Sequence, residues 1–456
     1  MRIVKYFEKI SYKTLLCGLA AVAITTVLVV FSSSAADKAK DGSSFELFKQ
    51  VQLFADAITL IDDDYVKKVE IKELIHGAIK GMMKTLDGYS QFLDEESFRE
   101  IREETKGEFG GIGVEIGIRD GFLTVITPIE GTPASESGIT AGDKVVKISG
   151  EITKDITLDE AVRKLRGTPG TEVSLTVMKE SGEMMDIVLK RAVIKLKSVK
   201  IAKMISGDIA YIKLVEFQER TARDLDEALK SLEKEGASCL ILDLRNNPGG
   251  LLDSAIEVSE KFLEKGKLIV YTEGRDPRET TKFFSRINPD HSEIDIVVLV
   301  NKGSASAAEI LAGALQDNKR ALLLGETTFG KGSVQTVIPL KDDSALRLTT
   351  AAYYTPSGRN LMDKGIEPDI KVEMDQKKNA TDKMDLGVEK KSELFEKLEK
   401  EKDKNQNKEK PGELPEQTEL EDEQIRAAVN ILRGVKVFEA NKADLSEKKE
   451  LIVDTE

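Results

Sequence analysis

The sequence is short of the residues that most often build disulfides and metal sites. Among 456 residues there are two cysteines, two histidines and no tryptophan. Cys17 lies in an apolar N-terminal run, and Cys239 opens the run Cys239–Asp243, which is typical of a buried strand. These two cysteines exclude an intrachain disulfide framework and a zinc site built on clustered cysteines.

Histidine is also too scarce to favour the commonest hydrolase mechanism. His76 lies in a stretch with helical periodicity and His291 in a polar loop, and neither has a plausible nucleophile near it in sequence. A Ser-His-Asp triad would need a long-range approach of one of them. A hydrolase here is therefore expected to use another base. A lysine can serve if burial lowers its pKa from about 10.4 to about 7 or 8.

Acidic residues outnumber basic residues, so the formal net charge is −13 at pH 7. Nucleic-acid binding needs a basic surface, so we expect no nucleic-acid partner. An acidic surface otherwise indicates little beyond solubility.

One long apolar run, residues 14–31, lies near the N-terminus. Four basic residues precede it, and Ser34-Ala35-Ala36 follows it. Basic, apolar and small segments in this order are typical of a secretory signal, but the run is also long enough to stay as a membrane anchor. In both cases the body crosses the membrane. We therefore expect residues 1–36 to place the protein in the cell envelope, outside the cytoplasmic membrane.

The chain after residue 36 divides into five parts. Apolar residues recur at helical spacing in the first part, and a helix with one apolar face must pack on something, so we expect a docking or dimerisation arm and a homo-oligomer. Charged and amide residues dominate 376–420, which is typical of a disordered insertion. The predicted parts are a helical region at 37–107, a β-rich domain at 108–192, a core at 193–375, the insertion at 376–420, and a C-terminal helix and tail at 421–456.

In the core, apolar strands alternate with amphipathic helices. That alternation predicts a layered α/β fold. The predicted strands are 210–214, 240–244, 294–300 and 321–324, and the predicted helices are 222–234, 252–263 and 306–316.

Ser306 is the candidate nucleophile, because it stands where the strand 294–300 has ended and a helix begins. Ligands bind beyond the carboxyl ends of strands in α/β sheets, and unpaired N–H groups at a helix N-terminus stabilise an oxyanion. From this segment alone, however, the favoured interpretation is structural: Ser306 and Glu309 have the spacing of a capping box.

Lys331 is the candidate base, and its glycine neighbours permit tight backbone paths and close packing. The segment from Gly325 to Lys331 also satisfies most of a phosphate-binding loop. However, Gly332 stands where a Ser or Thr should bind magnesium, and residues 334–339 are strand-like rather than helical. Because the helix N-terminus that should hold phosphate is missing, we do not expect an ATPase.

The run Asp243–Gly250 is the third candidate segment. It follows an apolar strand, precedes a helix and ends in Asn-Pro-Gly-Gly. Alone, this ending is typical of an ordinary turn, although Gly249 and Gly250 could direct N–H groups into a site as oxyanion donors.

Together these segments resemble the carboxy-terminal processing peptidases, also called tail-specific proteases. They occur in the family's order and cover roughly residues 45 to 375. The matching segments are Gly110–Val114, Leu165-Arg166-Gly167, Asp243–Gly250, Ser304–Ile310, Gly325–Gln335 and Gly365–Asp369. Each segment alone is weak, but the combination is specific, and it favours a nucleophile at Ser306 over a bare cap.

The resemblance implies an α/β fold of the crotonase or Clp-protease type, with an inserted β-rich PDZ domain and an N-terminal helical arm. It implies a serine endopeptidase that cleaves envelope proteins at or near their C-termini without a metal or another cofactor. It assigns Ser306 as nucleophile, Lys331 as general base and Gln335 as the residue that orients the lysine. Oxyanion N–H groups would come from Ala307 and from Gly249 or Gly250.

A PDZ domain adds an extended peptide as a strand and captures its terminal carboxylate on backbone N–H groups. The resemblance therefore predicts protein or peptide partners with small or apolar C-termini. The candidate peptide-binding residues lie in the glycine loop, in the strand after it, on the helix 158–165 and directly after that helix. They are Gly110, Gly111, Ile112, Gly113, Val114, Ile116, Leu158, Val162, Leu165 and Arg166.

The chain also departs from the family pattern. Leu86-Asp87-Gly88-Tyr89-Ser90 stands where relatives usually carry Asp-Pro-His-Ser, which leaves the geometry of the helical arm open. The charged insertion leaves the role of the C-terminal tail open. The competing class is a catalytically inactive PDZ scaffold on a protease-like fold, and the joint presence of the serine, the lysine and the glutamine speaks against it.

Overall fold

The computed structural model describes residues 42–373 and 422–453, apart from residues 120, 180, 277, 279 and 363. The predicted signal or anchor at 1–36 and the predicted insertion at 376–420 lie outside the described residues. The chain forms two compact units that divide between Leu86 and Asp87. Among the described helices, none combines the length and the apolar character that a membrane span requires.

The described part of the first unit contains two helices, α2 (Gly42–Asp64) and α3 (Ile71–Met83), and both confirm the predicted helical spacing. Large apolar side chains of α2 are exposed to solvent, among them Phe45, Phe48 and Leu53. None of the described residues of this unit covers these side chains.

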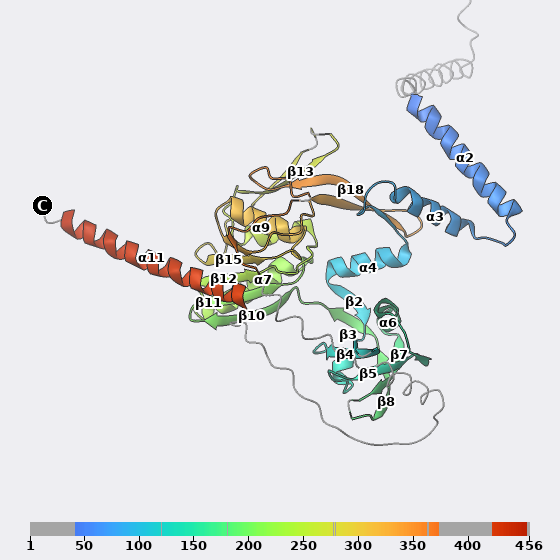
Figure 1. Ribbon diagram of the computed structural model, residues 1–456, viewed down its shortest axis with the longest axis horizontal. Coiled ribbons are helices and arrows are strands. Elements are labelled where there is room, and N and C mark those ends of the chain that lie inside the picture. Colours follow the sequence, from blue (N-terminus) through green and yellow to red (C-terminus); the bar gives the residue numbers. More distant parts are fainter. Residues whose placement is uncertain are drawn as a thin grey trace, which may run out of the picture. The chain divides into compact units, whose positions relative to one another are not determined.

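A six-stranded sheet forms the centre of the second unit (Figure 1). Its order is β10-β11-β12-β15-β16-β19, in which β10 and β11 pair antiparallel and the other neighbours pair in parallel. The four predicted core strands are confirmed as β11, β12, β15 and β16. The bounds are β10 (Val199–Ser206), β11 (Ile209–Leu214), β12 (Cys239–Asp243), β15 (Asp295–Val300), β16 (Leu322–Gly325) and β19 (Ile370–Lys371).

Helices cover both faces of this sheet, as a layered α/β fold requires. Leu240 and Leu242 of β12 pack in a core with three helices on one face, whereas Ile241 packs in a second core with α11 on the other. Successive side chains of a strand point to opposite faces, so one apolar strand serves both layers. The helices are α7 (Thr221–Lys234), α8 (Leu252–Glu260) and α9 (Ala307–Asp317) on the first face, and α11 (Glu423–Val453) on the second.

A second sheet carries the strand that follows Lys331. Its order is β1-β18-β13-β14, and β17 also pairs with β18. The strand predicted at 334–339 is confirmed as β17. The bounds are β1 (Gln91–Leu93), β13 (Leu268–Gly274), β14 (Thr281–Phe284), β17 (Ser333–Pro339) and β18 (Ala345–Tyr354), with α4 (Glu95–Lys106) after β1.

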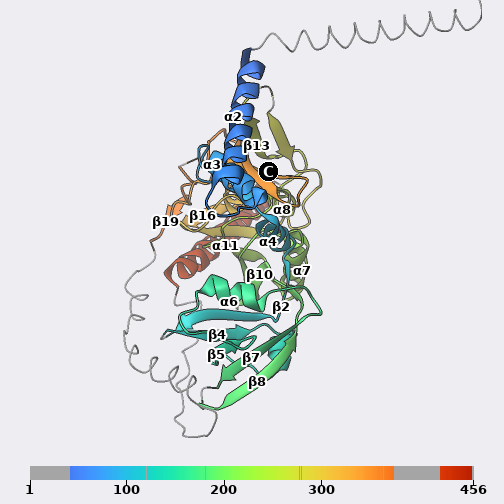
Figure 2. The same cartoon turned by 90° about the vertical axis from the view of Figure 1, so that its right-hand side faces the viewer.

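The β-rich domain is an antiparallel sheet with helix α6 lying against β3 and β5 (Figure 2). Helix α6 has the predicted bounds, and Thr157 and Glu160 cap it reciprocally. The elements are β3 (Val114–Arg119), β4 (Phe122–Pro128), α5 (Pro133–Glu136), β5 (Lys144–Ile148), β6 (Glu151–Ile152), α6 (Leu158–Leu165), β7 (Glu172–Met178) and β8 (Met184–Lys190). A ladder of β2 (Glu108–Gly111) and β9 (Ala192–Lys195) joins the two ends of the domain.

Candidate active site

The loops that carry the candidate residues follow three neighbouring parallel strands. These are β12, β15 and β16, whose carboxyl ends lie at the same edge of the central sheet. The Leu244 N–H donates to the Leu299 carbonyl at 2.9 Å, and the Glu326 N–H donates to the Val300 carbonyl at 3.0 Å. Parallel sheets bind ligands at this edge, so the topology brings the three loops to a place suited to a site.

Ser306 adopts a backbone conformation that serine rarely takes. Its φ is 55° and its ψ is −115°, directly before the first residue of α9. A residue in such a region costs on the order of 1–3 kcal/mol, and it persists only where its surroundings enforce it. The Ala305 N–H holds the preceding residue by donating to the Asn247 carbonyl at 2.9 Å. A sharp, strained strand-to-helix turn of this kind is what exposes a nucleophilic serine in other hydrolases.

The buried carboxylate of Glu309 joins the Ser306 segment to the Lys331 segment. Its Oε2 accepts hydrogen bonds from the Ser306 N–H at 2.8 Å and the Lys331 N–H at 2.9 Å. Its Oε1 accepts from the Gly330 N–H at 2.7 Å and the Thr328 hydroxyl at 2.5 Å. The capping box predicted for Ser306 is present, and the same glutamate also holds the loop of the candidate base.

The neighbouring Ser304 has a structural role. It is buried, and its Oγ donates to the Leu244 carbonyl at 2.8 Å and accepts from the Asn301 N–H at 3.0 Å. Because this hydroxyl is committed to two main-chain groups, Ser306 is the better placed nucleophile of the pair.

Gly249 lies directly against the Ser306 segment. A Cβ on Gly249 would fall 2.7 Å from Ser306 Cβ and 2.9 Å from the Ala307 nitrogen. The Gly249 N–H, however, donates to the Asn247 side-chain oxygen at 2.9 Å. Within the described residues, the N–H groups of Gly250 and Ala307 make no hydrogen bond. These two N–H groups are therefore the ones available to an oxyanion.

Lys331 is half-buried and has the electrostatic surroundings that a lysine base needs. Burial lowers the pKa of its ammonium, and the charge of Arg347 on β18 lowers it further, while the Glu309 carboxylate opposes both effects. The Lys331 Nζ lies 5.4 Å from the centroid of the Tyr89 ring. A lowered pKa increases the fraction of neutral amine near neutral pH, which is the form that accepts a proton.

The side chains of the three candidate catalytic residues are not bonded to one another. Among the described residues, no hydrogen bond joins Ser306 Oγ, Lys331 Nζ and the Gln335 amide, and the buried Gln335 Nε2 has no partner. Glu309 brings the Ser306 and Lys331 segments together through their backbones only. Proton transfer between Ser306 and Lys331 therefore requires a side-chain rotation from this arrangement.

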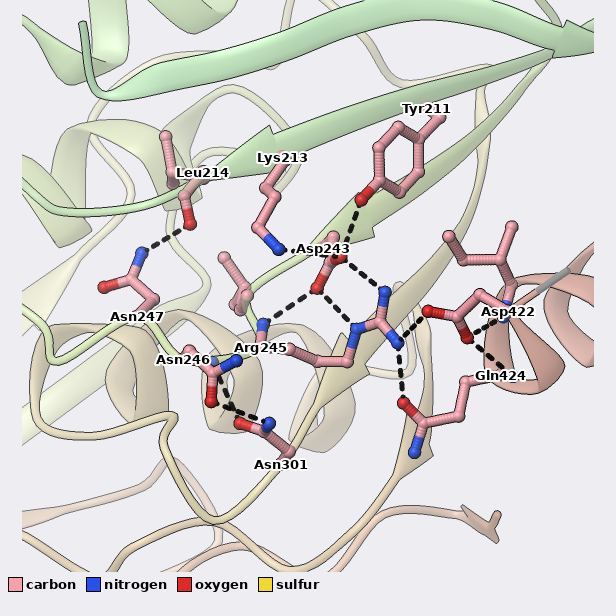
Figure 3. A network of polar contacts seen from close by, with 12 residues as sticks. Tyr211, Lys213, Leu214, Asp243, Arg245, Asn246, Asn247, Asn301, Asp422 and Gln424 are labelled. Atoms are coloured by element: carbon pink, nitrogen blue, oxygen red, sulfur yellow. Dashed lines mark hydrogen bonds and ion pairs between the residues drawn. The ribbon is translucent and has the colours of Figure 1, made fainter. Parts of the chain in front are cut away.

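A polar network anchors the loop that follows β12 (Figure 3). The Asp243 carboxylate accepts bonds of 2.7–2.9 Å from the backbone and guanidinium of Arg245, and one of 2.7 Å from the Tyr211 hydroxyl. Burial alone would raise the pKa of Asp243, but the Arg245 bonds hold it below its ordinary value. Arg245 also donates to Asp422 at 2.7 Å and Gln424 at 2.9 Å. The start of α11 is thus tied to the glycine loop beside Ser306.

The candidate peptide groove lies between β3 and α6 in the β-rich domain. The carbonyls of Ile112 and Gly113 each accept a 2.9 Å bond, from the N–H groups of Ala134 and Ile129, while their own N–H groups make none within the described residues. Such bare N–H groups can receive a terminal carboxylate. A cavity of about 90 Å³ beside them is lined by Phe109, Gly111, Ile112, Gly113, Val114, Ile116, Val162, Leu165 and Arg166.

Two predicted groove residues do not line this cavity. The Gly110 carbonyl accepts the Gly167 N–H at 3.1 Å, which ties Gly110 to the residue that follows Arg166. Leu158 is exposed at the first turn of α6. Conversely, Phe109 lines the cavity although it was not predicted to, and its ring lies 4.6 Å from the Arg166 guanidinium.

The alternative chemistries find little support in the described part of the chain. The residues there include no cluster of His, Cys, Asp or Glu suited to a metal ion. Strand β17 follows Lys331, so the phosphate-loop interpretation lacks the helix it needs. His291 is bonded to the Glu233 carboxylate at 2.7 Å and lies 3.3 Å from that of Asp226. It therefore stands among acids rather than beside a nucleophile.

Comparisons with known proteins match the three parts of this architecture. The family model described as Peptidase family S41 matches residues 208–372, a PDZ domain model matches 100–178, and the Activating protease CtpB N-terminal domain matches 25–97. A carboxy-terminal-processing protease of Bartonella bacilliformis is 42% identical over 359 residues, which are 78% of this chain and 81% of that relative. The chain belongs to the carboxy-terminal processing proteases.

A second relative of this protease supports that assignment. The carboxy-terminal processing protease CtpA of Bacillus subtilis is 36% identical over 80% of this chain and 77% of its own length. A solved photosystem II D1 C-terminal processing protease is 29% identical, covers 71% of this chain and 92% of its own, and has a TM-score of 0.43. The predicted fold class, a serine-protease α/β core with a PDZ domain, is confirmed.

Four contacts of this carboxy-terminal processing protease were not predicted from its sequence. Glu309 was predicted only as a cap, and Asn247 only as part of a turn. No local pattern marks Arg347. The departure at Tyr89 was connected only with the geometry of the helical arm, but its ring also contacts Lys331. That consequence was hidden because the contact depends on the pairing of β1 with β18, more than 250 positions later in the chain.

Proposed function

We propose that this chain is a serine endopeptidase that cleaves envelope proteins at or near their C-termini, with Ser306 and Lys331 as its catalytic dyad. The observation that carries the proposal is the Glu309 carboxylate, which binds the Ser306 N–H at 2.8 Å and the Lys331 N–H at 2.9 Å. Because this buried carboxylate accepts four hydrogen bonds, it holds the Ser306 and Lys331 segments in fixed positions relative to each other. The strained backbone of Ser306 and the lowered pKa of Lys331 support the same assignment.

In the proposed mechanism, the neutral Lys331 amine rotates towards Ser306 and accepts the proton of its hydroxyl. Gln335, whose Nε2 is unpartnered here, orients the lysine in this rotated position. Ser306 Oγ attacks the scissile carbonyl carbon, and the N–H groups of Gly250 and Ala307 stabilise the oxyanion. The C–N bond then breaks, the leaving amine takes the proton from Lys331, and water hydrolyses the acyl-enzyme.

The test is cleavage of an unfolded protein and labelling by a fluorophosphonate, with residues 37–456 as the enzyme. Ser306→Ala should abolish both signals, and Lys331→Ala and Lys331→Arg should abolish cleavage, because arginine cannot act as a neutral base. Ser304→Ala should keep labelling and lose stability, and Lys302→Ala controls for loss of an exposed lysine in the same loop.

Two results would contradict the proposal. Cleavage that persists in Ser306→Ala would remove the nucleophile. A wild-type chain that binds peptides but neither cleaves them nor reacts with the fluorophosphonate would instead favour the inactive PDZ scaffold.

We further propose that the body lies outside the cytoplasmic membrane and that copies associate through the exposed apolar face of α2, which includes Phe45 and Phe48. The signal-like residues at 1–36 support the first point, and an uncovered apolar helix face supports the second. N-terminal sequencing distinguishes a start at Asp37 from an intact membrane-bound Met1, and a cytoplasmic full-length product would contradict both. Sedimentation of residues 42–456 should show an oligomer that Phe48→Glu dissociates.

A further inference from the structure

The Lys331 ammonium lies over the ring of Tyr89, a residue far from it in the sequence. Its Nζ is 5.4 Å from the centroid of Tyr89, a side chain that is 38% exposed. A cation within about 6 Å of a ring centroid is attracted by the ring quadrupole. This attraction acts on the protonated lysine and largely disappears for the neutral amine.

The Tyr89 ring is carried by a short, well-anchored turn. The Asp87 carboxylate accepts hydrogen bonds from the N–H groups of Tyr89 and Ser90, both at 2.7 Å, and from the Ser90 hydroxyl at 2.8 Å. The Ser90 Oγ also accepts the Thr349 N–H of β18 at 3.1 Å. The turn is thus fixed to β18, which pairs with the strand that follows Lys331.

Two other charged groups act on the Lys331 ammonium, and neither makes a hydrogen bond to it within the described residues. Arg347 on β18 repels the ammonium. The Glu309 carboxylate on α9 attracts it, but both of its oxygens already accept two hydrogen bonds each. Ser306 Oγ makes no hydrogen bond to Lys331 within the described residues. The ring therefore holds the protonated side chain in an arrangement in which the dyad is not assembled.

We propose that Tyr89 is a positioning residue that holds the protonated Lys331 side chain away from Ser306 and so raises the pH at which the base becomes available. The proposal rests on the dyad proposed above. When Lys331 loses its proton, the attraction of the ring is lost and the amine is free to rotate towards the serine hydroxyl. Tyr89 thereby opposes burial and Arg347, which both favour the neutral amine.

The experiment is the pH dependence of the fluorophosphonate labelling rate, which needs no peptide substrate. In a plot of labelling rate against pH, Tyr89→Leu should lower the apparent pKa of the rising limb by about half a unit. Well below that pKa, the labelling rate should therefore be about threefold higher than in the wild-type enzyme. Tyr89→Phe keeps the ring face and should leave the limb in place. Phe329→Leu, a change of an exposed aromatic residue two positions before Lys331, is the matched control and should not shift the limb. Each pH profile is normalised to its own plateau, so that only the position of the limb is compared. If Tyr89→Leu does not fold, Tyr89→Met takes its place.

The outcomes separate this proposal from the one on which it rests. If labelling requires both Ser306 and Lys331 but the limbs of Tyr89→Leu and Tyr89→Met coincide with the wild-type limb, the role of Tyr89 is wrong and the dyad stands. An equal shift in Tyr89→Phe would also overturn it, because the ring face would then not be the cause. If Ser306→Ala is still labelled, the dyad itself is wrong.

Discussion

At the scale of single residues, the site depends on one buried carboxylate. Glu309 caps helix α9 from its own first turn, yet it also binds the N–H groups of Gly330 and Lys331. A serine at positive φ would relax if its N–H lost this acceptor. Glu309 therefore serves two purposes: it maintains the strained conformation of Ser306, and it fixes the loop of the candidate base Lys331.

Glu309→Gln tests this double role, because an amide of the same shape loses the charge and replaces one acceptor oxygen by a donor. We expect the free energy of unfolding to fall by about 2 kcal/mol. We also expect kcat to fall about ten- to a hundredfold, since misplacement of a base by about 1 Å is sufficient for such a loss. Urea unfolding and peptide cleavage measure the two effects, and exposed Glu367 provides the Glu→Gln control. An unchanged kcat would show that the loop of Lys331 does not need this anchor.

With Lys331 as the proposed general base, its lowered pKa predicts the pH dependence of the wild-type enzyme. A general base must be neutral, so kcat/KM should rise about tenfold per pH unit below that pKa and level off above it. The activity is thus lost as the pH falls. Histidine-directed reagents should have little effect on the rate. Inactivation that follows modification of His291 would contradict the lysine mechanism.

The candidate residues could be predicted from sequence to very different degrees. Ser306 and Lys331 could be assigned from the order of several segments along the chain, although the Ser306 segment alone favoured a helix cap. The contact of Tyr89 with Lys331 depends on strand pairing between distant segments, and no spacing rule reports it. Gly249 and Gly250 could not be separated until the Asn247 side chain was seen to take the Gly249 N–H.

At the scale of secondary-structure elements, α11 completes the core. Ile425, Val429 and Leu432 pack against the sheet face that the other three helices leave uncovered. The helix itself was predicted from its periodicity. Its place was not predictable, because residues 374–421 separate it from β19 and give no indication of where the chain returns.

The start of α11 is also connected to the site through Arg245. Asp422 accepts hydrogen bonds from the N–H groups of Gln424 and Ile425 as a helix cap, and from Arg245 at 2.7 Å. Arg245 directly precedes the turn that contacts Ser306. Docking of the helix and the geometry of the glycine turn are therefore coupled through one guanidinium.

Two substitutions at Asp422 separate the cap from the link to Arg245. Asp422→Ser retains a capping hydroxyl but removes the charge, so we expect a loss of about 1 kcal/mol of stability and about a fivefold loss of kcat. Asp422→Ala loses the cap as well and should cost about 2 kcal/mol. Urea unfolding and cleavage kinetics test both, with exposed Glu423→Ala as the control. Loss of stability without loss of kcat in Asp422→Ser would show that α11 does not influence the site.

At the scale of the whole molecule, the chain joins a protease core to a PDZ domain that has a candidate peptide groove. The cavity of about 90 Å³ in that groove suits one small apolar side chain, and the N–H groups of Ile112 and Gly113 are available beside it. Burial of one such side chain and capture of one carboxylate make a selective but weak contact. We therefore expect the groove to choose substrates by their C-termini, and we assign the cleavage itself to the proposed nucleophile Ser306.

Selection by the C-terminus predicts a difference between two peptides that are identical except that one ends in a free carboxylate and the other in an amide. The free acid should be cleaved with at least about tenfold higher kcat/KM, because the amide loses its charge-assisted bonds to the groove. Val162→Glu places a negative charge in the groove and should abolish this preference, whereas Val188→Glu, at an exposed position of β8, should not. Glycine replacements are poorer probes, since a Cβ on Gly113 would fall 2.3 Å from the Thr132 side chain and disturb the fold itself. Equal cleavage of the two peptides by wild-type enzyme would remove the PDZ groove from substrate selection and leave the dyad as the only determinant of activity.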